Sequence, residues 1–409
     1  MSRVLQLGLG VVTAIGGFVD IGNLVTSGIT GARFGASLTW AIVVGTIGMT
    51  VYAEMAGRVT AVGGRAVFHA VRDRLGVRVS LVNLIASAVL NLVTLSAELA
   101  GVSIVLELAT GVNYLIWVPI VAAAVWLVIW RLPFTWLENV FGLLGLALVV
   151  FVVALFKLPT DWHGLWHEAT HPSVPAGEGH PTYFFYAVSL FGACLVPYQI
   201  VFFSSGGREE KWTAKSIGEM RMNAVIGFPL GGILSIAIMA AAVPVLRPRN
   251  VDVNHLGQVA LPVAQALGVT GLVLALVGFF AATFAAGAEC ALSTGYIVSQ
   301  YFGWNWGKMH RPAAAPRFHL VCLMALIVAT AFILTTIDPV TVTLVAVVLG
   351  AAAVPLTYFP VLVVANDREY MGDRVNRGLS NTLGTVFLLI MIVTSIITLP
   401  LLFITKAGQ

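Results

Sequence analysis

Long apolar segments separated by short polar ones run through the whole chain. At about 20 residues, such a segment can cross the hydrocarbon core of a bilayer as an α-helix, whereas a β-barrel needs shorter segments of alternating polarity. The pattern therefore predicts an all-α integral membrane protein. Eleven transmembrane helices are predicted, at residues 4–30, 38–57, 80–108, 114–130, 133–156, 184–205, 222–245, 262–302, 318–337, 340–365 and 381–403.

The eighth of these segments, residues 262–302, is too long for one straight crossing. A segment longer than the bilayer is thick tilts, kinks or extends into the interface, where Tyr and Trp are enriched. We therefore expect this helix to tilt or break, or to end among interfacial residues such as Tyr301 and Trp304.

Composition supports a membrane protein and indicates its orientation. Charged residues make up 10% of the 409 residues, against roughly 25% in soluble domains. With a cytoplasmic N-terminus, seventeen of the 22 Lys and Arg residues fall on the cytoplasmic side, as the positive-inside rule requires. The net charge of +4 thus reflects topology and gives no reason to expect a nucleic-acid partner. We predict a multi-pass protein of the cell (inner or plasma) membrane, in contact with the lipid bilayer, and the sequence leaves its oligomeric state open.

The chain lacks the short motifs of common catalytic and metal sites. It contains no GxxxxGK[ST], GxSxG or HExxH pattern, so neither nucleotide-driven nor hydrolytic chemistry is indicated. Cys194, Cys290 and Cys322 fall in predicted helices without CxxC spacing, which argues against a disulfide framework or a zinc site. We therefore expect no enzymatic activity and no cofactor.

Polar residues interrupt the first apolar segment in the stretch VDIGNLVTSG, at residues 19–28. An ionised carboxylate inside a membrane costs several kcal/mol, so Asp20 marks a candidate functional site. Gly22 lies between Asp20 and Asn23 and weakens a helix by about 1 kcal/mol relative to Ala. We expect the helix to break here, with the break resting on Gly22 and on tertiary contacts.

The sixth apolar segment carries a matching interruption. When residues 16–31 (GGFVDIGNLVTSGITG) are aligned with residues 192–207 (GACLVPYQIVFFSSGG), Asn23 faces Gln199 and Ile21 faces the helix breaker Pro197. The two helices are predicted to run in opposite directions, which indicates inverted repeats. Paired interruptions in such repeats are typical of a transporter site near the membrane midplane. A structural kink at each position is the alternative.

These residues resemble the Nramp-type divalent metal transporters. Asp20-Ile21-Gly22-Asn23 is similar to the Asp-Pro-Gly-Asn motif of that family, and further similar segments occur along the chain: Gly31-Ala32-Arg33-Phe34-Gly35, Ala97-Glu98, Leu137-Glu138, Ala285-Ala286-Gly287, Asp367-Arg368 and Met371-Gly372. The resemblance implies a LeuT-like fold of two inverted five-helix repeats, about 4–156 and 184–365, plus one extra helix at about 381–403. The whole chain, 1–409, would form a single transporter domain.

The resemblance also implies a metal site, with one departure. In the family the ligands are the Asp and Asn side chains, a backbone carbonyl from each broken helix and a Met thioether from a Met-Pro-His motif, which here reads Val196-Pro197-Tyr198. Without the thioether, a soft ligand, the remaining oxygen ligands suit a hard cation such as Mg²⁺, although Mn²⁺ also accepts oxygen. Nramp-related magnesium transporters show a similar loss of the Met. The predicted substrate site comprises Asp20, Gly22, Asn23, Cys194, Leu195, Val196, Tyr198 and Gln199.

Proton coupling of the usual kind is not expected. The two His positions and the acid that the resemblance associates with protons are occupied by Tyr198, Phe203 and Leu95. Glu98 and Glu289 remain as candidate pathway acids, or as paired structural groups. We therefore predict alternating-access transport of a divalent cation. The alternatives are transport of an organic cation held by Asp20, or of another organic solute, on the same fold, and a non-transporting receptor or channel-like protein.

The loop after the fifth segment contains three histidines, His163, His167 and His171, at intervals of four. A helix would align them on one face beside Glu168, a spacing that can bind a transition metal. The alternative is a solvated loop without a metal.

Overall fold

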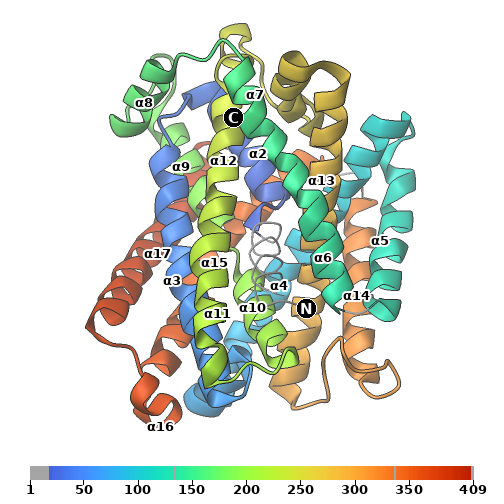
Figure 1. The fold of residues 1–409 in the computed structure, drawn as a ribbon, viewed down its shortest axis with the longest axis vertical. Helices are drawn as coiled ribbons and strands as arrows, with labels where there is room; N and C mark the ends of the chain where they lie inside the picture. The colour runs from blue at the N-terminus through green and yellow to red at the C-terminus, as the bar shows by residue number, and fades with distance from the viewer. Residues whose placement is uncertain (1–17, 133, 336–337, 407–409) are drawn as a thin grey trace.

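The computed structural model describes residues 18–132, 134–335 and 338–406, which form helices and no β-strand. Most helices run along one common direction to form a bundle (Figure 1). Ten helical segments of the described chain are long and apolar enough to cross a membrane. Residues 4–17 of the first predicted segment, 4–30, lie outside the described residues. Residues 21–30 of that segment belong to α2.

The helix bounds, in chain order, are α2 (Ile21–Phe34), α3 (Thr39–Gly63), α4 (Val67–Thr110), α5 (Tyr114–Arg131), α6 (Phe134–Gly145), α7 (Val150–Lys157), α8 (Trp162–Thr170), α9 (His180–Cys194), α10 (Pro197–Glu209), α11 (Ile217–Met222), α12 (Phe228–Ala242), α13 (Leu256–Phe302), α14 (Pro316–Ile333), α15 (Pro339–Ala365), α16 (Arg368–Met371) and α17 (Gly378–Ile404). A 3-10 turn, Leu146–Val149, joins α6 to α7, and a π-helical turn, Asn223–Gly227, joins α11 to α12.

Two predicted interruptions are confirmed. The sixth segment is divided into α9 and α10, with Leu195 and Val196 in non-helical conformations between them. The eighth segment is α13, whose 47 residues are kinked at Gly268, where φ is 63° and ψ is −149°. A positive φ of this kind is readily adopted only by glycine.

The predicted start of the third helix at residue 80 lies close to a kink in α4 at the non-helical Gly76 (φ 81°, ψ 172°), but the prediction that residues 58–79 form a connection is wrong. Helix α3 continues to Gly63, and α4 begins at Val67. The hydrophobic pattern identifies only the part of a helix that lies in lipid. Beyond that part a helix can continue with polar residues, as these two do.

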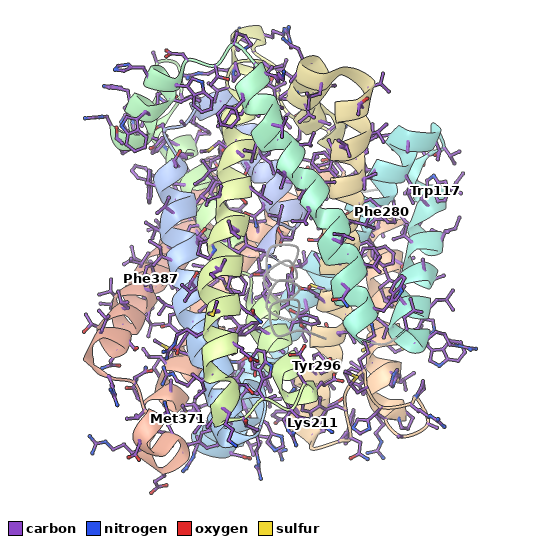
Figure 2. The ribbon with its side chains drawn as sticks, in the orientation of Figure 1. Trp117, Lys211, Phe280, Tyr296, Met371 and Phe387 are labelled. Atoms are coloured by element: carbon purple, nitrogen blue, oxygen red, sulfur yellow. The ribbon has the colours of Figure 1, made fainter. Side chains whose placement is uncertain are left out.

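Basic residues from distant segments gather at the end of the bundle that holds α11 and α16, where Lys211 and Met371 are labelled in Figure 2. There the Arg58 guanidinium donates to the carbonyl of Arg374 over 2.6 Å, and Arg221 pairs with Glu54 over 2.7 Å. The structure thus places at one end residues that the charge pattern assigns to one side of the membrane. That this side is cytoplasmic, and that the chain divides into two repeats, stay predictions.

Helix α2 lies inside the bundle, and all of its residues except Arg33 are buried (Figure 1). It packs against α9, α12, α13 and α15. Gly31 allows the closest approach, because a Cβ atom there would overlap the backbone carbonyl of Met239 and lie 2.8 Å from the Cβ of Ala242 in α12. The position of α2 therefore depends on a side chain being absent at residue 31.

We predict that Gly31→Ala destabilises the protein by about 1–3 kcal/mol, the usual range for overpacking in a close-packed core. The measurement is the thermal unfolding temperature of the purified protein in detergent. Gly218→Ala in α11 is the matched control, because a Cβ at residue 218 would meet no other atom within 4 Å. Equal unfolding temperatures for the two variants would contradict the predicted contact between α2 and α12.

Candidate functional site

Two carboxylates lie at the N-terminus of α2, in the interior of the protein. Asp20 has extended backbone angles and caps the helix, since its carboxylate accepts a hydrogen bond from the backbone N–H of Asn23 over 2.9 Å. The carboxylate of Glu98, from α4, accepts from the backbone N–H of Ile21 at 3.3 and 3.4 Å. These N–H groups have no acceptor within the helix, and the positive end of the helix dipole also favours negative charge. Among the described residues, α2 thus begins at the predicted interruption, and its start is stabilised from two helices.

Gly22 does not make the break, contrary to the prediction. The chain leaves the helical conformation at Val19 and Asp20, whereas Gly22 belongs to the first turn of α2. A Cβ at Gly22 would lie 2.8 Å from Cγ2 of Val347 and 3.1 Å from Oδ1 of Asp20. Gly22 is therefore needed for the close approach of α2 to α15 rather than for its backbone flexibility.

Asn23 connects the two broken helices. Its side-chain nitrogen donates to the carbonyl of Phe18 over 2.8 Å and to the carbonyl of Ala193, near the end of α9, over 2.9 Å. Carbonyl oxygens only accept, so these contacts fix which end of the amide is nitrogen. The amide oxygen accepts from the hydroxyl of Ser235 in α12 over 3.3 Å. Asn23 is fully buried and holds three helices together in this structure.

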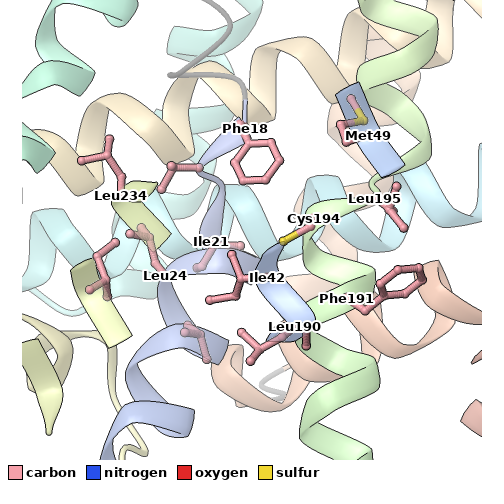
Figure 3. Close-up of a cluster of buried hydrophobic side chains, with 14 of the residues drawn as sticks. Phe18, Ile21, Leu24, Ile42, Met49, Leu190, Phe191, Cys194, Leu195 and Leu234 are labelled. Carbon is pink, nitrogen blue, oxygen red and sulfur yellow. The ribbon is translucent and has the colours of Figure 1, made fainter. Parts of the chain in front are cut away.

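The residues predicted in the break of the sixth helix divide into two groups. Val196 and Tyr198 line a cavity next to Asp20, whereas Cys194, Leu195 and Gln199 are buried and do not line it. The thiol of Cys194 points toward the amide oxygen of Asn23, 3.8 Å away. Figure 3 shows Cys194 and Leu195 among apolar side chains of the core, which include Ile21, Phe191 and Met49.

The cavity lies where α2, α4, α15 and the break between α9 and α10 meet, and it has an empty volume of about 410 Å³ including its opening. Most of its lining is apolar. Its polar side chains are Asp20, Asn91, Thr94, Glu98, Tyr198 and Thr343. Among the described residues that line it there is no Lys, Arg or His, and no sulfur atom.

Asn91 and Thr94 line the cavity but were not predicted from the sequence as site residues. Both lie on α4, seven and four residues before Glu98, so all three share one helix face. Polar residues at helical spacing inside an apolar segment were a signal that could have identified them. The amide nitrogen of Asn91 and the hydroxyl of Tyr198 are buried and have no hydrogen-bond partner among the described residues.

Glu289 lies in α13 with 6% of its surface exposed, and it does not line the cavity. Glu289 makes no ion pair with a described residue. Glu289 does interact electrostatically with Asp20 and Glu98. Whether Glu98 and Glu289 belong to a transport pathway stays a prediction.

These carboxylates have no basic partner in the part of the chain that the structure describes. None of its ion pairs includes Asp20, Glu98 or Glu289. A buried, unpaired carboxylate is costly and is neutralised in practice by a proton or by a bound cation. The arrangement can therefore bind a positively charged ligand through oxygen atoms.

The histidine loop does form a helix, α8, at the opposite end of the bundle from α16 (Figure 1). His163 and His167 lie within it, His171 follows its last residue, and the rings of His167 and His171 stack with their centres 4.7 Å apart. Glu168 instead pairs with Arg247 over 2.7 Å. No three His, Cys, Asp or Glu residues of the described chain are grouped so that they could hold a metal ion, at α8 or elsewhere.

Comparisons with known proteins agree with this architecture. The family model described as natural resistance-associated macrophage protein-like (Nramp) matches residues 10–400. The chain is 24% identical over 400 residues to the divalent metal cation transporter MntH of Klebsiella pneumoniae (strain 342), which covers 95% of this chain and 92% of the relative.

Solved structures share the fold. The manganese transporter of Eremococcus coleocola, in complex with an aromatic bis-isothiourea substituted compound, has a TM-score of 0.76 at 20% identity, covering 96% of this chain and 85% of that one. Mhp1, a nucleobase-cation-symport-1 family transporter, has a TM-score of 0.64 at 17% identity, covering 98% and 91%. These likenesses confirm the LeuT-like all-α fold that was expected from the sequence. The family model covers nearly the whole chain, and the protein therefore belongs to the Nramp family.

Proposed function

We propose that this protein transports a divalent metal cation across the membrane by alternating access, with Asp20 as the anionic ligand. The observation that carries the proposal is the buried Asp20 carboxylate, which lines a cavity between two broken helices without a basic partner among the described residues. The relatives named divalent metal cation transporter MntH and the Eremococcus coleocola manganese transporter support this substrate class.

The proposed ligands are oxygen atoms. The carboxylate of Asp20 and the hydroxyl of Tyr198 line the cavity directly. Carbonyl groups at a helix end lack donors within the helix. Those of Cys194 and Leu195, where α9 unwinds, are therefore proposed as backbone ligands in a conformation that turns them toward the cavity, which neither residue lines here. The amide oxygen of Asn23 is proposed as a further ligand, because it has two lone pairs and accepts from Ser235 with one, although Asn23 does not line the cavity in this conformation.

Three of the predicted site residues take supporting roles in this proposal. The carbonyl of Gly22 accepts from the hydroxyl of Thr26 over 2.6 Å, so Gly22 contributes space rather than a ligand. Gln199 is buried away from the cavity. Val196 lines the cavity without a donor atom and sets which metals bind.

The proposed preference is for a hard cation, Mg²⁺ before Mn²⁺. No sulfur atom of a described residue lines the cavity, because Val196 stands there and the thiol of Cys194 points toward Asn23. Oxygen ligands with few carboxylates suit Mg²⁺, which keeps several of its waters. Thioether and thiolate ligands would shift selectivity toward softer transition metals.

Transport is proposed to proceed without a coupled proton. Tyr198 and Phe203 stand where the resemblance places proton-carrying histidines, and Glu98 is engaged by the backbone N–H of Ile21. The driving force would be the gradient of the ion together with the membrane potential. An interior-negative potential favours entry of a dication by roughly 4.6 kcal/mol per 100 mV, twice the value for one charge.

An organic cation paired with Asp20 is the competing substrate. The mostly apolar lining of the cavity, with the Asp20 carboxylate among it, suits a ligand that has an apolar body and a positive charge. The experiments below distinguish the two substrates, because only the first predicts uptake of the bare metal.

The first prediction concerns Asp20. Protein in liposomes that enclose a Mg²⁺ indicator will show saturable Mg²⁺ uptake, and Asp20→Ala will reduce it to the level of empty liposomes, because the only proposed anionic ligand is gone. Asp161→Ala is the matched control, since Asp161 is an exposed helix cap of α8. Absence of Mg²⁺, Mn²⁺ and Ca²⁺ uptake by the wild type would refute the proposed substrate class and favour an organic cation.

The second prediction concerns selectivity. Val196→Met places a thioether in the cavity and should raise the preference for Mn²⁺ or Cd²⁺ over Mg²⁺ about tenfold, equivalent to roughly 1.4 kcal/mol. The measurement is the ratio of KM values for the two metals. Val196→Leu, which adds bulk without sulfur, should leave the ratio unchanged, and an equal shift in both variants would contradict a role for sulfur.

The third prediction concerns protons. During Mg²⁺ uptake driven by an interior-negative potassium diffusion potential, the internal pH of the liposomes should stay constant while the uptake rate rises with the potential. A pH-sensitive dye inside the liposomes provides the measurement, and empty liposomes provide the control. Acidification in a fixed ratio to Mg²⁺ entry would show that transport is proton-coupled.

A further inference from the structure

One face of α4 carries a stripe of polar residues that continues from the cavity toward the end of the bundle that holds α16. Its members are Asn83, Ser87, Asn91, Thr94 and Glu98, at intervals of four, four, three and four residues. Residues at such intervals lie above one another on a helix. The stripe faces α15, because Asn83 donates to the carbonyl of Leu356 over 2.8 Å and Ser87 lies 3.4 Å from the hydroxyl of Thr357.

Both ends of this stripe have structural partners. Besides its bond to Leu356, Asn83 accepts a hydrogen bond from Ser87 over 3.0 Å, and Glu98 accepts from Ile21 at the start of α2. Asn91 differs from them. The nitrogen of its side-chain amide is buried without an acceptor, and its oxygen accepts no hydrogen bond from a described residue, although Asn91 is only 2% exposed and lines the cavity. An unsatisfied buried polar group opposes folding, so packing alone does not explain an Asn at this position.

The cavity is open beside Asn91. Contacts of Asn83 with Leu356 and of Arg74 with Asp367 show that α4 and α15 run antiparallel, which places Gly350 near the level of Asn91. Gly350 is buried and lines the same cavity, yet a Cβ there would meet no atom within 4 Å. The hollow therefore extends along α4 to the amide of Asn91.

Asn91 and the carboxylates occupy different levels. Seven residues separate Asn91 from Glu98, which corresponds to about 10 Å along the helix axis. Metal–oxygen bonds are only about 2.0–2.6 Å long for Mg²⁺ and Ca²⁺, which is much less than this separation of Asn91 from Glu98.

We infer that Asn91 forms a second station for the transported cation, between α4 and α15, on the α16 side of the Asp20 site. The amide oxygen is a hard, uncharged acceptor that can bind a divalent cation directly or one of its waters. Because it carries no charge, it binds more weakly than a carboxylate, which suits a site that an ion must also leave. This inference rests on the proposed transport of a divalent cation.

The test is Mg²⁺ uptake into liposomes by Asn91→Leu, which keeps the approximate size of the side chain and removes its amide. We expect KM to rise about fivefold, the effect of losing one polar contact of about 1 kcal/mol. We also expect the thermal unfolding temperature to stay the same or to rise, because the variant removes an unsatisfied buried amide. If Asn91 had a purely structural role, Asn91→Leu would lower the thermal unfolding temperature.

Two further variants complete the test. Ser87→Ala is the matched control on the same stripe, since its hydroxyl already bonds to Asn83, and its KM should stay within about twofold of the wild type. Asn91→Asp adds a charge at the proposed station and should lower KM for Mg²⁺ and slow its release.

If Asn91→Leu and Asn91→Asp both match Ser87→Ala in KM while Asp20→Ala abolishes uptake, the Asn91 station is refuted and the proposed function stands. If the wild type takes up no divalent cation, the proposed function itself fails.

Discussion

The backbone N–H groups at the start of a helix have no acceptor within that helix, and in this protein the start of α2 lies deep inside a bundle of apolar helices. Water does not satisfy them there, so side chains must. Asp20 and Glu98 supply the acceptors, from α2 itself and from α4. In return, the N–H groups and the helix dipole stabilise two carboxylates that an apolar interior would otherwise disfavour. The start of α2 inside the bundle and the two carboxylates beside it are therefore a single feature.

The same region shows why fold and site share residues. Asn23 joins the break in the first helix to the end of α9 and to α12, so its amide contributes to the packing of three helices. Displacing any of these three helices would therefore break at least one hydrogen bond of the Asn23 side chain.

The ligands that the cavity can offer are set by the side chains that line it in the described part of the chain. Val196 provides no sulfur, and neither Tyr198 nor Phe203 can carry a proton as a histidine does. Oxygen atoms and apolar walls remain, and the carboxylates lack a basic partner among the described residues. The polar face of α4 extends this environment from Glu98 to Asn91, where an amide without a partner meets open space beside Gly350.

The sequence by itself determined the class of fold, because about 20 apolar residues in a row have few alternatives to a membrane helix. It also located both breaks, since Asp20 and Pro197 are incompatible with uninterrupted apolar helices. It could not show which of the nearby residues line the cavity. Gly22 was expected to make the break and proved to be a packing residue. The hydrogen bonds of Asn23 to α9 and α12 were not predicted, and Asn91 was overlooked on a helix 68 residues further along the chain. Those assignments depend on which helices meet and in what register, and only the tertiary structure brings residues so far apart in the chain into contact.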